Sequence, residues 1–360
     1  MAAPRSKARK TLPVASADDL LRWYDRHGRN LPWRVKHGQP DAYRVWLSEI
    51  MLQQTTVTAV IPYYEKFLSR WPNINALSAA ELDDVLVAWA GLGYYRRAHN
   101  LHRCAQTVAK SMEGNFPQNA KALKQLPGIG DYTAAAVAAI VYGERANVVD
   151  GNVERVMARL HAVKTPAPQN KRHIRELAAA LLPERRVGDY AQALMDLGAT
   201  VCTPKRPNCS ACPWNASCVA FNQVSAESYP VASAKSDKPK RYATAFWLEN
   251  HQGQVWLRRR PPTGLLAGML EVPTSKWQVD YDAVADNVLA GLTQRPAWQT
   301  LTNTIRHSFT HFDLYVRVMY AISHNQPENG AWYDQGDLKS LALPSLMRKI
   351  AAAVALWRDG

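Results

Sequence analysis

Between residue 16 and about residue 200, apolar side chains recur every three to four positions, which is the period of amphipathic α-helices. Proline and glycine separate the helical stretches. A first helix is predicted to begin after Ser16, whose hydroxyl can cap it, with Asp19 three residues further on. Other helices are predicted at residues 43–54, 80–89, 97–112, 132–142, 152–162 and 172–182. This part of the chain is therefore expected to be all-α.

The pattern changes after residues 224–241, which are rich in Ser, Ala and Lys and have the composition of a linker. Residues 242–248, 254–257 and 312–322 alternate between apolar and polar as half-buried strands do, and residues 343–357 predict a helix. We therefore predict a multidomain chain in which an all-α domain precedes a smaller α+β domain. The predicted segments are a disordered basic arm (1–15), the all-α domain (16–223), a linker (224–241) and the α+β domain (242–360).

Composition and charge narrow the class of protein. Of the 360 residues, 47% are hydrophobic and 21% are charged, which are ordinary globular values. The sequence contains no run of about 18 uncharged apolar residues and no secretory signal, so we expect no membrane span and, for a bacterial source, a cytoplasmic protein associated with the nucleoid.

The net charge of +14 is concentrated in the first two thirds of the chain. Up to Arg241 there are 33 Lys and Arg against 20 Asp and Glu, whereas the remainder has 11 against 10. A strongly basic globular region is expected to bind a polyanion, because cationic side chains that neutralise phosphates release condensed counterions. A basic surface that only serves solubility remains the alternative at this point.

Four of the five cysteines fall within 17 consecutive residues, with six, two and five residues between them. These are Cys202, Cys209, Cys212 and Cys218; Cys104 is set aside as a core thiol. Four thiolates can bind zinc or an iron–sulfur cluster. Zinc sites more often have two short Cys pairs far apart, and only one short pair exists here. The spacing thus favours a cluster and leaves zinc open.

Residues 126–133, LPGIGDYT, join two helical stretches. Pro127 ends the first stretch, while Gly128 and Gly130 permit a tight hairpin within residues 119–143. Backbone N–H groups of such a hairpin, together with the start of the next helix, can bind a DNA phosphate. An ordinary turn between two helices is the alternative.

Two carboxylates stand out. Glu49 lies in the apolar stretch WLSEIMLQQT (46–55), where burial would raise its pKa and make it a general acid. A solvent-facing position on the helix is the alternative. Asp150 lies in the turn VVDGNV (148–153), where it either caps the next helix or serves a site.

The hairpin, the Asp turn and the cysteine spacing together resemble the helix-hairpin-helix DNA glycosylases of the endonuclease III type. Three stretches, WLSEIMLQQT, GLGYY (91–95) and DGNVERV (150–156), are similar to the MutY-type adenine DNA glycosylases, as is the appended second domain. The resemblance covers nearly the whole chain from about Ser16. It implies a base-excision-repair enzyme that hydrolyses the N-glycosidic bond of adenine mispaired with 8-oxoguanine or guanine in double-stranded DNA. It also implies a [4Fe–4S] cluster on the four cysteines, and we expect a monomer.

The resemblance also implies the roles of individual residues. Glu49 would be the general acid toward adenine N7 and would help to activate the incoming nucleophile. Asp150 would stabilise the cationic sugar, electrostatically or through a transient covalent bond, with support from Asn152. Tyr132 stands where the bifunctional relatives have a lysine that forms a Schiff base, so the enzyme is expected to be monofunctional. Tyr132 would instead lie beside the sugar and position Asp150.

An adenine in a duplex must be flipped out before it can react. By the family's pattern, Gln54 and Tyr94 would enter the helix near the lesion, with Leu92 close by and Thr55 touching the opposite base. Tyr94 and Tyr95 could instead be core aromatics, although GLGYY is too rich in glycine for a helix interior. The flipped adenine would be held by Trp33, Arg34, Leu52, Val57 and Gln192.

The second domain resembles a Nudix-fold module. After Gly268 it has Glu271 but no Arg-Glu-x-x-Glu-Glu run, so we expect binding and not hydrolysis. Residues Phe309, Thr310 and His311 match a Phe-Ser-His motif that reads 8-oxoguanine in the opposite strand. Thr310 replaces the usual serine, and its methyl group restricts the rotamer.

Two other functions remain to be weighed. One is an endonuclease III-like enzyme for oxidised pyrimidines, against which Tyr132 and the second domain argue. The other is a non-enzymatic iron–sulfur protein that binds DNA, in which replacing Glu49 or Asp150 would leave function unchanged.

Overall fold

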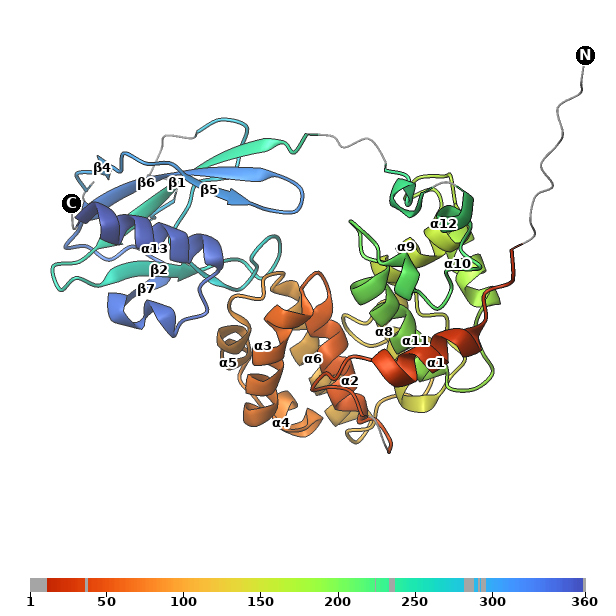
Figure 1. Ribbon diagram of the computed structural model, residues 1–360. Helices are drawn as coiled ribbons and strands as arrows, with labels where there is room; N and C mark the ends of the chain where they lie inside the picture. The colour runs from red at the N-terminus through yellow and green to blue at the C-terminus, as the bar shows by residue number, and fades with distance from the viewer. Residues whose placement is uncertain are drawn as a thin grey trace, which may run out of the picture. The chain divides into compact units, whose positions relative to one another are not determined.

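The computed structural model describes residues 12–35, 38–223, 225–232, 237–281, 288–290, 292 and 296–358. The chain forms two compact units (Figure 1), one from residues 1–54 and 107–235 and the other from residues 55–106 and 236–360. Of the predicted arm, residues 1–11 lie outside the described residues, as do parts of the predicted linker. The domain boundaries drawn from the sequence therefore stay predictions.

The first unit is helical, as the pattern predicts. Its helices are α1 (Ala17–His27), α2 (Ala42–Leu52), α7 (Ala120–Leu123), α8 (Asp131–Tyr142), α9 (Gly151–Leu160), α10 (Lys171–Ala180), α11 (Val187–Asp196) and α12 (Val219–Gln223). Ser16 caps α1, as predicted, because its side chain accepts a hydrogen bond from Asp18 N at 3.1 Å. Helix α8 packs against α2 and α11, so the starts of α8 and α9 can meet the middle of α2 in one region.

After α11 the chain enters the cysteine-rich loop. A π-helical turn, η1 (Leu197–Val201), continues α11 directly, and two short 3₁₀ turns follow at η2 (Cys209–Ala211) and η3 (Ala226–Ser228). Trp214 is 2% exposed and donates from its indole nitrogen to Ser16 O at 2.8 Å. This loop is therefore fixed to the start of α1.

The second unit combines helices with a β-sheet. Its helices near the middle of the chain are α3 (Val57–Arg70), α4 (Ile74–Ser78), α5 (Leu82–Trp89) and α6 (Arg96–Ser111). Its later elements are β1 (Lys240–Glu249), β2 (Val255–Arg259), β3 (Leu270–Glu271), β4 (Gln299–Thr300), β5 (Ile305–Ser308), β6 (Asp313–Ile322), β7 (Gly330–Tyr333), η5 (Gln335–Lys339) and α13 (Ser345–Arg358). The predicted α+β character of the C-terminal part is confirmed.

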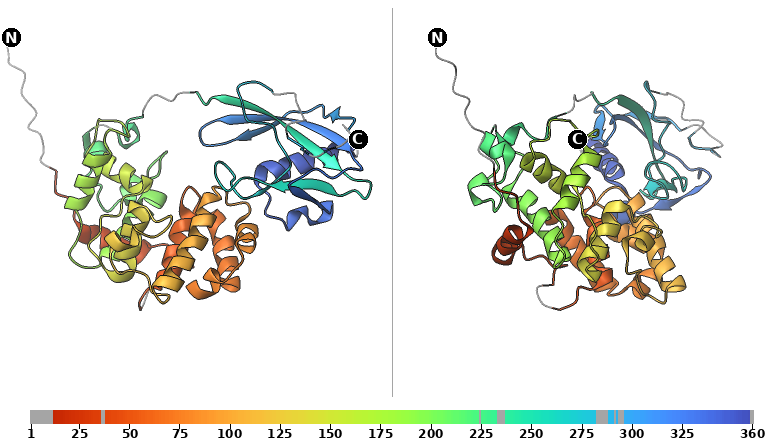
Figure 2. Two further views of the ribbon diagram at one scale, coloured as in Figure 1. Left: turned by 180° about the vertical axis from the view of Figure 1, so that it is seen from behind. Right: turned by 90° about the vertical axis from the view of Figure 1, so that its right-hand side faces the viewer.

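The sheet has the order β3-β2-β1-β6-β4, with β5 paired to β6 and β7 paired to β2. Strands β1 and β6 run parallel and pair from Lys240 with Asp313 to Glu249 with Ile322. Helix α13 lies on one face of the sheet (Figure 2) and packs its buried residues against β1, β2 and β6. The hairpin of β5 and β6 presents residues 309–312 at its tip.

Two strands differ from their predictions. Residues 254–257 were expected to alternate, but Val255, Trp256 and Leu257 of β2 are all buried, because they pack into clusters on both faces of the sheet. Residues 242–248 were expected to be half-buried, but β1 is buried continuously from Ala243 to Glu249. Trp247 belongs to the cluster under α13, whereas Phe246 and Leu248 pack on the opposite face with Trp256. The half-buried prediction is wrong because β1 is a central strand covered on both faces. Strand β6 does alternate as predicted.

None of the described helices has the length and apolar character of a bilayer span.

Candidate active site

The Glu49 carboxyl lies in the interior of the first unit. The residue is 4% exposed and sits in the middle of α2 among buried side chains, so the solvent-facing alternative is wrong. The pKa of Glu49 is raised from 4.5 to about 7, mainly by burial and also by the nearby charge of Asp150, against the lowering effects of the Tyr132 hydrogen bond and the Arg34 charge. Glu49 Oε2 has no hydrogen-bond partner among the described residues. At neutral pH this carboxyl can therefore hold a proton that it is able to transfer.

Asp150 is the N-cap of α9, so the capping interpretation is correct. Its Oδ1 accepts from Val153 N at 2.7 Å, and its Oδ2 accepts from Asn152 Nδ2 at 2.8 Å. Capping does not exclude a role in a site, because these two hydrogen bonds fix the direction of the carboxylate at the start of a helix. Asn152, predicted to support the site, does contact Asp150.

Tyr132 is in the first turn of α8. Its hydroxyl donates to Met195 Sδ at 3.2 Å and lies near both carboxylates. Burial, followed by the charges of Glu49 and Asp150, raises the pKa of Tyr132 well above its usual 10. Its phenol therefore stays neutral, and the structure brings together the residues predicted to be catalytic.

Sequence reasoning missed Asp196, which is fully buried at the end of α11. Its Oδ2 and Oδ1 accept from Arg34 Nη1 and Nη2 at 2.6 and 2.7 Å, and Arg29 donates to it through both its backbone N and Nε. Burial alone would raise the pKa of Asp196, but the hydrogen bonds and charge of Arg34 hold it below its usual value. Asp196 lies in the apolar stretch ALMDLG (193–198), and an acidic residue in an apolar stretch is the same signal by which Glu49 was predicted to be buried.

A chain of hydrogen bonds leads from Asp150 toward the cysteine-rich loop. Asn152 Oδ1 accepts from Arg155 Nη2 at 2.9 Å, and Arg155 also donates to Cys202 O at 2.8 Å and to Gly198 O at 2.7 Å. A Cβ at Gly198 would stand 2.6 Å from Asn152 Cβ, so glycine is needed there for η1 to approach this closely. The carboxylate and the loop are thus packed as one piece.

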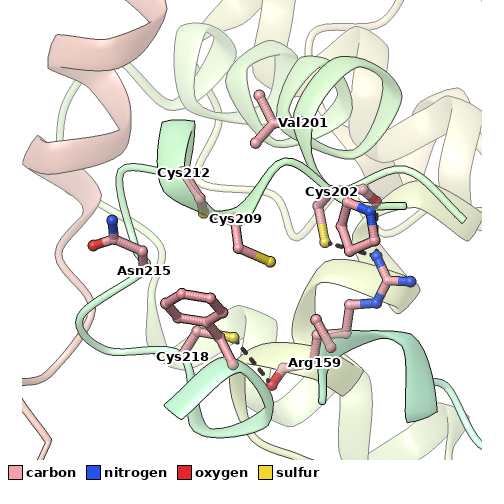
Figure 3. Close-up of a pocket in the computed structure, with 10 residues that line it drawn as sticks. Arg159, Val201, Cys202, Cys209, Cys212, Asn215 and Cys218 are labelled. Carbon is pink, nitrogen blue, oxygen red and sulfur yellow. Dashed lines mark hydrogen bonds between the residues drawn. The ribbon is translucent and has the colours of Figure 1, made fainter. Parts of the chain in front are cut away.

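The four cysteines line one pocket, shown in Figure 3. They come from the end of η1, from η2, and from the loop before α12. The other lining residues are Arg159, Val201, Pro207, Asn215, Phe221 and Ala226. Among the described residues, no group of three or more His, Cys, Asp or Glu side chains is arranged to hold a single metal ion. The thiols instead surround a common space.

The chemistry of this pocket suits a group bound by thiolates. None of the described residues that line it has a carboxylate or imidazole, and soft sulfur ligands select zinc, copper(I) or iron–sulfur clusters. Arg159 is 2% exposed and donates from Nη1 to Cys202 Sγ at 3.3 Å, which supplies positive charge beside a sulfur (Figure 3). Burial raises the pKa of the Cys212 thiol to about 12, so bound metal is needed to hold it as a thiolate. Cys104 is fully buried elsewhere, as predicted for a core thiol.

The predicted hairpin is present between α7 and α8. Gly128 has a φ of 77°, and Gly130 is the N-cap of α8 with nothing within 4 Å of a Cβ built on it. Leu126 and Ile129 are buried beneath the turn. The turn therefore has the glycine conformation that the sequence predicts, with open space where a side chain at Gly130 would stand, and phosphate binding stays a prediction.

The residues predicted to hold the adenine, and Gln54 and Thr55, which were predicted to contact the duplex beside it, divide between the units. In the first unit, Trp33 is buried, Leu52 and Gln192 are half-buried, and the Arg34 guanidinium is bound by Asp196. Gln54, at φ 57°, is exposed just beyond α2. In the second unit, Thr55 and Val57 are half-buried at the start of α3.

The GLGYY stretch forms a loop between α5 and α6 in the second unit. Tyr94 is 48% exposed at φ 49°, whereas Tyr95 is 4% exposed, so the core interpretation is right for Tyr95 and wrong for Tyr94. Leu92 is buried behind the loop. The Tyr94 hydroxyl is 2.8 Å from Thr310 Oγ1, which joins two of the residues predicted to meet the lesion.

Phe309, Thr310 and His311 lie at the tip of the β5–β6 hairpin, closed by a bond from Phe309 N to Phe312 O at 2.9 Å. Phe309 packs against Trp277 and Phe312 with ring centroids 5.4 and 4.9 Å apart. Thr310 and His311 are exposed. Phe309 therefore anchors the tip, and the two polar side chains are presented to solvent.

Glu271, the carboxylate near the position of a Nudix metal box, is 1% exposed. Arg258 Nε donates to it at 2.8 Å, and Arg260 also pairs with it. Both of its oxygens are engaged in ion pairs, so it serves the fold.

Comparison with known proteins agrees with this architecture. Residues 47–184 match the HhH-GPD superfamily of base excision DNA repair proteins, and residues 244–353 match the NUDIX domain. A thermostable thymine-DNA glycosylase of known structure is similar to 57% of this chain and 94% of its own, with 30% sequence identity and a TM-score of 0.51. The fold and the site thus define a helix-hairpin-helix base-excision-repair glycosylase.

Two relatives specify the family. The human adenine DNA glycosylase is 33% identical over 94% of this chain and 73% of its own length. The adenine DNA glycosylase of Buchnera aphidicola subsp. Acyrthosiphon pisum is 33% identical over 92% of this chain and 95% of its own. The chain belongs to the adenine DNA glycosylase family.

Proposed function

We propose that this enzyme hydrolyses the N-glycosidic bond of adenine mispaired with 8-oxoguanine or guanine, by flipping the adenine out of the duplex and protonating it. The observation that carries the proposal is the buried Glu49 carboxyl, with a pKa of about 7 and one oxygen without a partner among the described residues, beside Asp150. A general acid works best when its pKa is near the working pH.

The chemistry divides between the two carboxylates. Glu49 gives its proton to N7 of the flipped adenine, the bond from N9 to C1′ breaks, and its electron pair leaves with the base. The sugar then carries a positive charge like that in glycoside hydrolysis. Asp150, oriented by Val153 N and Asn152, stabilises that charge. Water adds to C1′ and returns its proton to the Glu49 carboxylate, which leaves an abasic site.

Tyr132 supports a monofunctional reaction. A neutral phenol cannot form an imine with C1′, so the strand is not cut by a lyase step. Its hydroxyl, held near Glu49 and Asp150, limits the positions that the sugar can take.

We further propose that the four cysteines hold a [4Fe–4S] cluster as thiolates. The four cysteines around one pocket support a group bound by sulfur, and their spacing, with only one short Cys pair, favours a cluster over a single zinc ion. When bound, this group would crosslink η1, η2 and the segment before α12. Arg159 and Arg155 hold Cys202 by its sulfur and its carbonyl oxygen, so the loop is fixed to the helix that carries Asp150.

Recognition of the opposite strand is assigned to the second unit. Tyr94 would enter the duplex and replace the stacking lost by the flipped base, and Thr55 would touch the opposite base. Gln54, at the end of the first unit's N-terminal segment, would also enter the duplex near the lesion. Thr310 and His311 would contact 8-oxoguanine, because they are the exposed polar residues of the hairpin tip. The basic surface and the hairpin before α8 would bind the backbone phosphates.

Single-turnover excision on four duplexes tests this function. They carry adenine opposite 8-oxoguanine, guanine or thymine, and an oxidised pyrimidine opposite guanine, each assayed with and without alkali. Breaks at adenine that require alkali, fastest opposite 8-oxoguanine, are expected. Breaks at the oxidised pyrimidine without alkali would assign the enzyme an endonuclease III-like activity instead. No excision on any duplex would favour a DNA-binding protein that is not an enzyme.

A further inference from the structure

Arg97, in the first turn of α6, places a buried cation directly behind the loop that carries Tyr94. The residue is 8% exposed, and burial lowers its pKa to about 10. Its Nη2 donates to Leu92 O and Gly93 O at 3.2 Å each, which are the two carbonyls that precede Tyr94. The same nitrogen donates to Thr55 Oγ1 at 3.1 Å. One guanidinium thus joins the loop that carries Tyr94 to Thr55, which lies just before α3.

Two aromatic rings also lie close to this guanidinium. Its Cζ lies 5.1 Å from the ring centroid of Trp89, which is fully buried, and 5.6 Å from that of Tyr94. A cation over an aromatic ring is attracted to it, and more strongly where water is excluded. Arg97 therefore contacts the Tyr94 side chain as well as the backbone that leads to it.

The backbone around Tyr94 needs such support. Gly91 and Gly93 have φ values of 113° and 71°, and Tyr94 itself has φ 49°, a left-handed conformation that a tyrosine adopts at a cost. Such a conformation persists only when surrounding contacts determine it. The exposed tyrosine is thereby held on a loop that would otherwise sample other conformations.

We propose that Arg97 is a positioning residue that fixes Tyr94 and Thr55 together before DNA binds. The proposal rests on the proposed function, in which Tyr94 enters the duplex and Thr55 touches the base opposite the adenine. A wedge that is already ordered avoids part of the entropy cost of ordering it in the complex. The planar fork of arginine suits the task because it donates in its plane and stacks on its faces, whereas a lysine ammonium cannot stack in this way.

The experiment is a double-mutant cycle between Arg97→Lys and Tyr94→Ala in the full-length protein. The matched control is Arg96→Lys, the same change at the exposed neighbouring residue. Single-turnover excision of adenine opposite 8-oxoguanine is measured for each variant, together with its thermal unfolding. Residues that act through one another give non-additive effects.

Arg97→Lys is expected to slow excision by at least about tenfold when Tyr94 is present and by less than about twofold in the Tyr94→Ala protein. Arg96→Lys is expected to change neither rate. An equal loss in both backgrounds would overturn the proposal, because Arg97 would then act independently of Tyr94. If Arg97→Lys slowed excision only by making the protein less stable, the rate would fall equally with Tyr94 present and in the Tyr94→Ala protein, which is the result that overturns the proposal.

A second readout does not depend on excision. A duplex with 2-aminopurine next to 8-oxoguanine is bound to protein that also carries Asp150→Asn, and the change in fluorescence on binding reports insertion beside the lesion. Tyr94→Ala is expected to reduce this fluorescence change, and Arg97→Lys is expected to cause most of the same reduction. A full change with Arg97→Lys would overturn the proposal. Failure of the wild-type protein to excise adenine would count against the proposed function alone, and the fluorescence would still decide the role of Arg97.

Discussion

Replacing Glu49 with glutamine should make the protein more stable at pH 8, because the native carboxyl is destabilising once it is ionised. The difference between its usual pKa of 4.5 and the value of about 7 in the fold corresponds to about 3 kcal/mol. The residue is 4% exposed, so little of this difference is screened by solvent. Glutamine has nearly the same shape and no charge to bury.

The effect has a defined dependence on pH. Below pH 4.5 the carboxyl is protonated in both the folded and the unfolded chain, so it does not influence the balance between them. As the pH rises from 4.5 to about 7, only the unfolded chain releases the proton, and the wild-type protein progressively loses stability. Above about pH 7 the loss is complete and constant. The advantage of Glu49→Gln should therefore be small at pH 5 and largest at pH 8.

Urea unfolding at pH 5 and pH 8 measures this difference. The control is Glu65→Gln, on an exposed residue of α3, for which the free energy of unfolding should follow that of the wild type at both pH values. A Glu49→Gln protein that is equally stable or less stable than the wild type at pH 8 would show that burial does not disfavour the charged form of Glu49.

Three further predictions concern separate parts of the protein. Asp150→Asn should abolish adenine excision while largely preserving affinity for the mispaired duplex, measured by titration, because binding rests on the basic surface and the hairpin; equal losses of both would count against this. Asp196→Ala should lower the free energy of unfolding by about 3–5 kcal/mol, because it removes the carboxylate that pairs with Arg29 and Arg34. Asp189→Ala, which removes an exposed ion pair on the same helix, should lower it by at most about 1 kcal/mol. Thr310→Val should reduce the ratio of excision rates opposite 8-oxoguanine and opposite guanine; an unchanged ratio would exclude its hydroxyl from recognition.

Local patterns predicted much of the fold. The Ser16 cap, the helical period up to about residue 200 and the alternation in β6 each depend on neighbouring residues, which the sequence shows directly. Continuous burial of β1 could not be predicted in the same way. It depends on its central place in the sheet and on α13, which lies about a hundred residues further along the chain.

The candidate site shows the same contrast. An acidic residue in the apolar stretch around Glu49 indicated burial, and its position beside Asp150 is what the structure adds. Asp196 carried the same signal and was missed, because its partners Arg29 and Arg34 are more than 160 residues away in sequence. Arg97 lies next to another arginine, and only the fold shows that one is buried and the other exposed.

The pH dependence of adenine release under single-turnover conditions shows whether Glu49 is the general acid. If the protonated form of Glu49 is the acid, the rate should be proportional to its protonated fraction, which is centred at about pH 7. The rate is expected to fall by about tenfold between pH 6 and pH 8, and the residual activity of Glu49→Gln is expected to show no such fall. A wild-type rate that is constant or rises over this range would contradict the assignment of Glu49 as the general acid.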